Sequence, residues 1–366
     1  MPSTGPSRRA LLRAGVLGLA SVGLLTGCSD DGVRTPWSPE PTVDEEEAAR
    51  RMPDGDLLLR ARERLAGHRA TLSRAQTRSA EEQATVASLA GLWQVQQERL
   101  EQLLVLGGIP LPELDVEILT PSPPDTATGD GADTTADPAP RTAAASEDGS
   151  ATTGPDGSAL TGPGSDAAER TATGPRPRAM GEQLHADLPE VLEDLSRSST
   201  VNRAMLISLS AQHAESARLL GAPVDWPPLV GPVGTAAVPV LARTRPAVFG
   251  LEVVAARSRG DERERYESVL APVRSVTRAL TTLAGDAAPL PPLGYDLPEP
   301  LDDEAQRLVL ARELVHDITP AALSVADRAG SDVDQLRSLV RLVAEARHWA
   351  DRLGLDPVPF PGMTLP

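Results

Sequence analysis

Residues 331–353 of the chain read SDVDQLRSLVRLVAEARHWADRL, with apolar side chains three and four positions apart. This spacing places them on one face of a helix, because an α-helix repeats every 3.6 residues. The face is formed by Leu336, Leu339, Val340, Val343 and Ala350. Ser331 and Asp334 predict its start, since a short polar side chain caps backbone N–H groups and an acid suits the positive end of the helix dipole. The stretch therefore predicts an amphipathic helix.

The same period runs through most of the chain outside its low-complexity stretches. It predicts helices at residues 57–75, 80–104, 179–196, 200–220, 236–257, 261–283 and 302–328. Strands would show a period of two, and no stretch does so convincingly. Aromatic residues make up only 2% of the chain, so Ala, Leu and Val must fill the core, and Ala and Leu favour helices. The predicted fold class is all-α.

Prolines complicate the helix assignment. Pro239, Pro246, Pro272 and Pro320 lie in or beside predicted helices, and a proline inside a helix costs about 3 kcal/mol. Either these helices are kinked, or some of the prolines mark helix starts that the periodicity merges.

The predicted helices suggest two helical groups joined by linkers. The first group combines residues 54–110 and 179–221, and the second spans residues 236–362. Residues 121–178 are rich in Pro, Gly, Ser, Thr and Asp. They carry too few large apolar side chains to offset the entropy of ordering, so a disordered linker is predicted. Three helix ends, LEQLLVLGGIPLP, ESARLLGAPVDWP and HWADRLGLDPVPFP, resemble one another, which raises the hypothesis of an internal duplication.

Residues 1–27 have the pattern of an export signal, with arginines followed by an apolar run that is short for a membrane span. The segment Leu25-Thr26-Gly27-Cys28 resembles the bacterial lipobox, which implies acylation of Cys28 and cleavage just before it. The alternative is a buried free cysteine. The prediction is a lipoprotein on the outer face of the cytoplasmic membrane, anchored through acyl groups on Cys28. The acidic, proline-bearing residues 28–53 would form its tether.

Arg8 and Arg9 lie in the segment SRRALLR, which resembles the twin-arginine export motif. That route carries folded proteins. The alternative is an ordinary export signal in which two arginines happen to be adjacent.

The composition excludes several classes of function. A single cysteine makes no internal disulfide and no cysteine-based zinc site. The formal net charge of −17 repels phosphate backbones, so nucleic acid is not an expected partner. No nucleophile elbow, phosphate-binding glycine loop or dinucleotide fingerprint is present. We therefore expect no catalytic residues and no cofactor.

The last third of the chain resembles a known family. The segments RPAVFGLEVVAARSRGDERERY, GYDLPEPLDDEAQRLVLARELV and VPFPG are similar to a ferritin-like-fold domain of unknown function, found on actinobacterial envelope lipoproteins. The resemblance covers residues 236–362 and implies a four-helix bundle, a surface location and no established activity. Residues 57–108 look like the amino-terminal portion of such proteins. Arg245-Pro246 stands where the resemblance leads us to expect an acidic residue, which weakens the case for an inherited metal site.

Ferritin-like di-iron bundles use Glu-x-x-His pairs that point inward. The chain has three such pairs, which are Glu182/His185, Glu313/His316 and Glu345/His348. Helical spacing points the last two pairs away from the apolar faces of their helices, so they should face water. In the first pair, Glu182 lies well off the apolar face and His185 lies at its flank. No metal site is predicted from them.

Two histidines and one glutamate instead lie on apolar stripes. His68 aligns with Leu65 and Leu72, His213 lies beside Leu209, and Glu82 is on the stripe of the second helix. If the first helical group had a buried polar site, these three side chains would be its candidates. The simpler interpretation is that each forms a hydrogen bond inside a small core.

Three hypotheses of function remain. The first is a lipid-anchored, non-enzymatic protein that binds an unknown protein or small molecule at the cell surface, and we favour it. The second is a metal- or cofactor-binding ferritin-like redox protein, which would bring carboxylates and imidazoles together. The third is a carrier of a small apolar ligand, which would enclose an apolar cavity.

Overall fold

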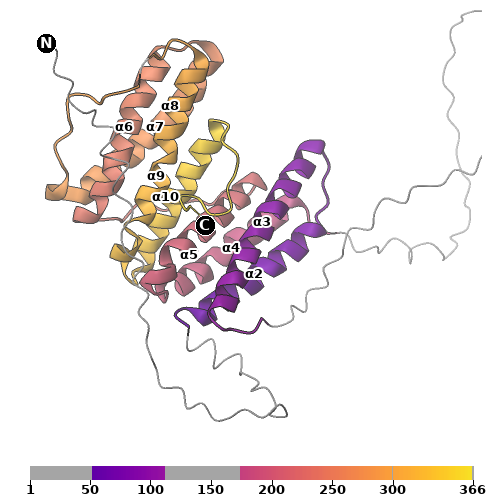
Figure 1. Ribbon diagram of the computed structural model, residues 1–366. Helices are drawn as coiled ribbons and strands as arrows, with labels where there is room; N and C mark the ends of the chain where they lie inside the picture. The colour runs from indigo at the N-terminus through magenta and orange to yellow at the C-terminus, as the bar shows by residue number, and fades with distance from the viewer. Residues whose placement is uncertain (1–51, 112–173, 299, 365–366) are drawn as a thin grey trace, which may run out of the picture. The chain divides into compact units, whose positions relative to one another are not determined.

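The computed structural model describes residues 52–111, 174–298 and 300–364, and within these residues it contains helices and connections but no strand (Figure 1). The all-α prediction is confirmed. All of the described residues belong to one compact unit of chain, residues 43–366. Arg8, Arg9, Cys28, nearly all of the tether and most of the predicted linker lie outside the described residues.

The first helical group consists of α2 (Gly55–Ser73), α3 (Ala80–Leu106), α4 (Pro177–Ser196) and α5 (Thr200–Leu219). Helix α2 packs on α3, and α4 packs on α5. The predicted stripes are the buried ones: Leu58 and Leu65 of α2 and Leu89 and Trp93 of α3 are fully buried. Two segments far apart in the sequence thus contact each other, α2 with α4 and α3 with α5.

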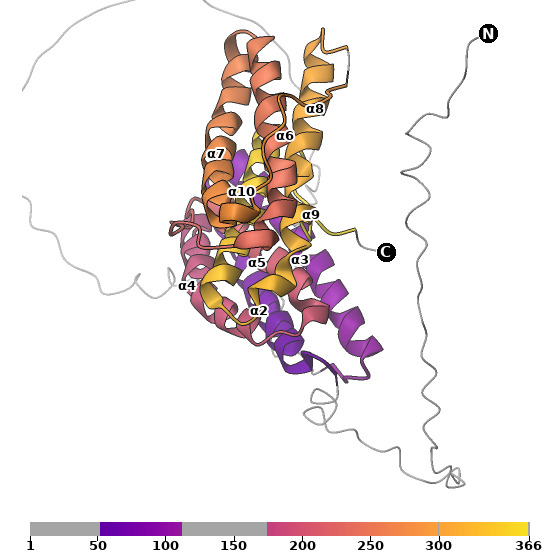
Figure 2. The same ribbon diagram turned by 90° about the vertical axis from the view of Figure 1, so that its left-hand side faces the viewer.

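The second group begins with α6 (Ala237–Ala256) and α7 (Gly260–Ala284), the most extensively packed pair of helices. Helices α8 (Glu304–His316) and α9 (Ile318–Leu323) lie against α6, and α10 (Val333–Arg352) closes the bundle (Figures 1 and 2). Short 3-10 helices occupy residues Gly234–Ala236, Gly285–Ala287 and Ala326–Ala329. A helical bundle therefore forms the C-terminal third.

The single helix predicted over residues 302–328 is wrong, because the chain breaks it between α8 and α9. Pro320 explains the break. It has no N–H to offer the carbonyl of His316, and its ring crowds that carbonyl, so α8 ends at His316. Pro239 lies in the first turn of α6, whereas Pro246 and Pro272 remain inside α6 and α7.

Helix α10 packs on both helical groups. It contacts α8 and α9 on one side and α4 and α5 on another. Its predicted face is buried as expected, but residues off that face are buried as well. Its cap is Asp332 rather than Ser331, because the Asp332 carboxylate accepts the N–H groups of Asp334 and Gln335 at 3.0 and 3.1 Å. These backbone bonds hold the pKa of Asp332 below its usual value.

The three similar helix ends share one backbone motif. After α3, α5 and α10 the N–H of Ile109, Ala222 and Leu355 bonds to the carbonyl five residues earlier, at 2.9, 2.9 and 3.0 Å. In each case the preceding residue is a glycine with positive φ, at Gly108, Gly221 and Gly354. This is the Schellman motif, in which glycine adopts the left-handed conformation without strain. The similarity thus has a local cause and requires no duplication.

Helices α4 and α5 approach closely at Gly181. A Cβ at this position would lie 2.8 Å from the backbone carbonyl oxygen of Ala217 and 3.0 Å from the Cβ of Ala222. Glycine is therefore needed here for close packing. Helix α4 of this pair lines the groove described below.

The closing segment VPFPG lies against the first helical group. Phe360 is buried, the hydroxyl of Ser208 donates to the carbonyl of Pro361 at 2.8 Å, and the amide of Gln96 donates to the carbonyl of Pro359. The C-terminal third is thus held to α3 and α5 by its last residues as well as by α10.

Candidate functional site

An open groove of about 490 Å³ lies between α4, the connection after α5 and the start of α10. We call it the α4–α10 groove. Its apolar lining consists of Ala186, Leu188, Pro189, Leu192, Val224, Trp226 and Pro227. Glu182, His185, Asp225 and Arg337 supply its charged or polar lining. Its size falls in the range of small-molecule sites, which is about 300–1,000 Å³.

Helix α4 builds the floor of the groove. Leu188 and Leu192 are buried and both line the groove. Because they lie one helical turn apart, they form a continuous apolar strip along α4. Pro189 lies inside the helix between them. Because proline has no N–H, the carbonyl of His185 lacks its helical donor at the groove.

The proline-rich connection forms the opposite wall and is held by α10. The N–H of Val230 donates to the hydroxyl of Ser338 at 3.1 Å, and the guanidinium of Arg341 donates to the carbonyl of Pro227. A second hollow of about 260 Å³, lined by Pro228 and Val230 among others, continues from the groove and shares Pro227 and Arg337 with it. The bonds made by Val230 and Arg341 hold the connection that carries Trp226, a partly buried residue that lines the groove.

Sequence reasoning missed this groove. The sequence singled out none of the lining residues Trp226, Asp225 and Arg337 as candidates. Helical periodicity gives no information on residues in a connection between helices. A tryptophan in a proline-rich connection was the available signal, because the chain has only four tryptophans.

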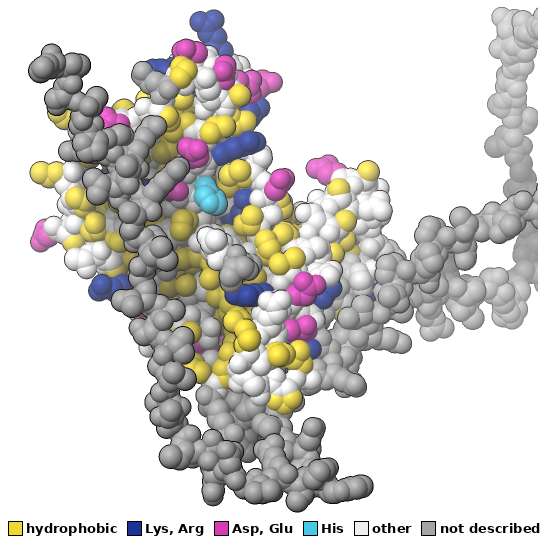
Figure 3. All heavy atoms as spheres, in the orientation of Figure 1, with side chains coloured by type: hydrophobic (Ala, Val, Ile, Leu, Met, Phe, Trp, Pro, Cys, Tyr) yellow, Lys and Arg dark blue, Asp and Glu magenta, His cyan; other side chains and the backbone are white. Residues whose placement is uncertain are grey.

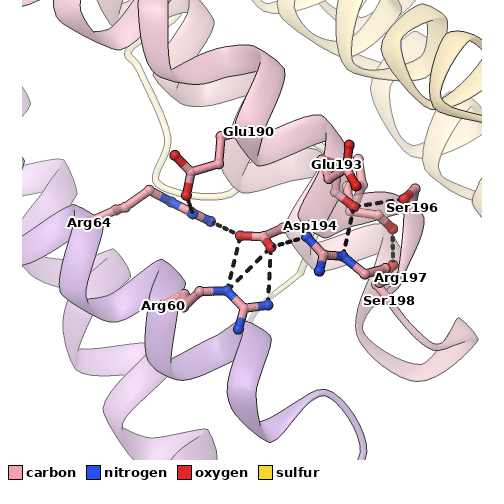
Figure 4. A network of polar contacts seen from close by, with 9 residues as sticks. Arg60, Arg64, Glu190, Glu193, Asp194, Ser196, Arg197 and Ser198 are labelled. Atoms are coloured by element: carbon pink, nitrogen blue, oxygen red, sulfur yellow. Dashed lines mark hydrogen bonds and ion pairs between the residues drawn. The ribbon is translucent and has the colours of Figure 1, made fainter.

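Helices α2 and α4 are joined by an arginine–aspartate network around Asp194 (Figure 4). Arg60 donates to the Asp194 carboxylate at 3.0 Å and Arg64 at 2.7 Å, while Arg197 approaches it at 3.2 Å. Burial alone would raise the pKa of Asp194, but the hydrogen bonds from Arg60 and Arg64 reverse this and hold it below its usual value. The carboxylate is fully compensated, so the network is structural.

Two of the three side chains that the sequence suggested as candidates for a buried polar site, His68 and His213, lie close together next to Trp93. The ring centroids of His68 and His213 are 5.8 Å apart, and each lies about 6 Å from Trp93, at 6.1 and 5.9 Å. His68 Nε2 lies 2.9 Å from an oxygen of Asp187, and His213 Nε2 lies 3.3 Å from Oε1 of Gln96. The two histidines thus have the hydrogen bonds that the simpler interpretation predicts.

This cluster adjoins a cavity of only about 30 Å³. Such a space holds one or two water molecules and no organic ligand. Burial lowers the pKa of His68, and burial with the nearby charges of His68 and Arg64 lowers the pKa of His213 to about 3. Both imidazoles are therefore neutral at pH 7.

Glu82, the third sequence candidate, does not join them. It lies in the first turn of α3, where its carboxylate accepts the N–H of Arg78 and its own N–H donates to the hydroxyl of Ser79. The arrangement resembles a capping box, except that the carboxylate accepts the N–H of Arg78 rather than that of the N-cap Ser79, and it explains the residue without a site.

Residues 236–365 match the model described as Domain of unknown function (DUF4439). This part of the chain is a DUF4439 domain. Comparison with curated proteins and comparison with solved structures each give no match. The domain spans α6 to α10 and the closing segment, so it supplies Arg337 to the α4–α10 groove, whereas α4 and the connection lie outside it.

Two of the Glu-x-x-His pairs belong to the DUF4439 domain. Glu313 and His316 are exposed on α8, as predicted. The expectation that Glu345 and His348 face water is wrong, because both are partly buried. For His348 the reason is that α5 packs on α10 and brings Glu215 to 3.8 Å from the imidazole, which a helical face drawn from one helix cannot show. The remaining pair, Glu182 and His185, is exposed at the groove, consistent with its position off the apolar face.

Within the described residues, Glu215, His348 and Asp351 place ligand-type atoms within 4.8 Å of one another. Arg218 already occupies this cluster. Its guanidinium lies 2.6 Å from the Glu215 carboxylate and 3.0 Å from the Asp351 carboxylate. Because the Arg218 guanidinium is bound to both carboxylates, little negative charge is left for a metal ion, and the cluster is a partly buried ion-pair network.

Side chains of both charge signs are interspersed with hydrophobic ones on the face seen in Figure 3, without a large single-sign patch. Among the described residues, no helix combines the length and the apolar character that crossing a membrane requires.

Proposed function

We propose that this chain is a lipid-anchored, non-enzymatic binding protein of the cell envelope, and that the α4–α10 groove holds small molecules with an apolar body. The observation that carries the proposal is the groove itself, an open volume of about 490 Å³ whose floor is Leu188 and Leu192. An apolar floor with a few polar groups at its rim is typical of ligand sites. The enclosed carrier cavity that we considered has no counterpart beside His68 and His213, where the space is about 30 Å³.

The anchor in this proposal is Cys28, placed on the outer face of the cytoplasmic membrane by export through Arg8 and Arg9. Support comes from the lipobox-like residues 25–28 and the apolar run before them. Residues 28–53 would then separate the helical part from the membrane surface.

Binding is tested with n-octanol as the probe and the chain from residue 29 onward, which contains every described helix. Ligand-observed NMR should detect octanol bound to this chain. Ala186→Trp fills the groove from an exposed position of α4, and it should abolish the signal. Ala179→Trp, also exposed on α4 but not lining the groove, is the matched control and should bind as the parent does. Unchanged binding by Ala186→Trp would refute the proposal.

A further inference from the structure

We infer that the α4–α10 groove selects organic cations, meaning molecules with an apolar body and a positively charged nitrogen group. The inference rests on the proposed function and names the ligand class of the same site. It requires that the groove present a net negative charge and an aromatic face, and both follow from particular contacts.

The charges of the rim are compensated except for one. Glu182 is paired with Arg178 at 3.0 Å on the same helix, and Arg337 is paired with Asp334. Asp225 forms no ion pair or hydrogen bond with any residue that the structure describes. A ligand that enters the groove therefore meets one carboxylate without a counter-charge.

Trp226 is the neighbour of Asp225 in the chain and lines the same groove. The face of an indole ring attracts cations through its quadrupole, by about 0.5–1 kcal/mol at exposed sites. A carboxylate and an indole side by side thus favour the same ligand group.

The charge of the whole chain acts in the same direction. A formal net charge of −17 draws cations towards the surface and repels anions. The guanidinium of Arg337 does not reverse this preference, because Asp334 holds it.

The test compares three probes of equal length, octylammonium, octanol and octanoate, with the chain from residue 29 onward at low ionic strength. We expect octylammonium to bind about tenfold more tightly than octanol, which corresponds to about 1.4 kcal/mol, and octanoate to bind most weakly. Asp225→Asn should bring octylammonium close to octanol. Asp296→Asn removes the same charge from an exposed position outside the groove and should leave the preference intact.

The variant Trp226→Leu distinguishes the attraction of the indole face for a cation from the apolar contact that the side chain makes. It should weaken octylammonium several-fold while octanol binding changes little, because leucine keeps the apolar contact but has no quadrupole. If octanol and octylammonium bind equally to the parent chain, or octanoate binds more tightly than octanol, the cation preference is overturned while the groove remains a binding site. If none of the three probes binds, the inference and the proposed function both fail.

Discussion

Arg218 of α5 lies 3.0 Å from Asp351 of α10, and this ion pair joins the first helical group to the DUF4439 domain. The same guanidinium lies 2.6 Å from Glu215, whose side chain is only 5% exposed. Burial raises the pKa of Glu215, and Arg218 opposes that rise. The negative charge of the Glu215 carboxylate at this interface is thus compensated mainly by Arg218.

Replacing that arginine should destabilise the protein strongly. In Arg218→Met, Glu215 is left buried without its counter-charge, and breaking a buried pair in this way costs about 3–5 kcal/mol. Urea denaturation at pH 7 measures the free energy of unfolding. Adding Glu215→Gln to the variant should recover part of the loss, whereas Arg178→Met, which breaks an exposed pair, should cost at most about 1 kcal/mol. A loss below about 1 kcal/mol in Arg218→Met would contradict the network.

His213 should make stability depend on pH in the acid range. Its pKa in the folded state is about 3, below the ordinary 6.5, so the unfolded chain takes up the proton first as the pH falls. The stability from a neutral His213 is complete above about pH 6.5 and is lost as the pH falls towards 3. The expected slope is about 1.4 kcal/mol per pH unit between about pH 6 and 4.

His213→Gln removes this titration. The unfolding free energy of the parent minus that of the variant should therefore become smaller or more negative as the pH is lowered from 7 to 4.5, whatever its value at pH 7. A constant difference for His213→Gln would show that the imidazole is not held neutral.

Gly181→Ala should destabilise although alanine favours helices. The new Cβ would meet the Ala217 carbonyl oxygen at 2.8 Å, and separating α4 from α5 costs about 1–3 kcal/mol. Helix propensity returns about 1 kcal/mol of this. Gly67→Ala in α2 meets nothing within 4 Å and should stabilise by up to about 1 kcal/mol. Thermal unfolding of the two variants gives opposite shifts if the close crossing is correct.

Arg245 should hold the connection between α7 and α8. Its guanidinium donates to the carbonyl of Pro289 and lies 3.5 Å from the Thr281 hydroxyl. In Arg245→Met, cleavage by chymotrypsin between residues 288 and 298 should accelerate about fivefold, since about 1 kcal/mol of hydrogen bonding is lost. Arg243→Met, which breaks the exposed pair with Asp317, serves as the control and should leave the rate unchanged.

Cys28→Ser tests the anchor. Without the thiol there is no acylation, so labelling with a fatty-acid analogue should disappear and the protein should leave the membrane fraction. Ser29→Ala is the neighbouring control and should keep both properties. Membrane retention and labelling of Cys28→Ser would rule out lipidation at this residue.

Local rules explain how much of the fold could be predicted. The predicted starts and ends of α3, α5 and α7 agree with the structure to within two residues, because the 3.6-residue period and the glycines after the helices act through neighbours in the chain. Leu89 and Trp93 were predicted to be buried for the same reason, and they are. Pro320 is the exception, because the period of the apolar residues continues across the break that it causes.

The site depended on contacts between distant segments. His68 and His213 could be proposed from their stripes, but their approach to 5.8 Å required α2 and α5 to pack together. Arg245 shows the same limit: its departure from the expected pattern was visible in the sequence, and its bond to Pro289 was not.

The sequence by itself determined that the chain is helical and which face of each helix is apolar, since both follow from spacing within one segment. Only the tertiary structure decided that Glu215 of α5 lies beside His348 of α10, and that Asp225 and Trp226 line a groove together with α4. The physical reason is that burial and charge compensation depend on which helices meet, and the partners here lie far apart in the chain.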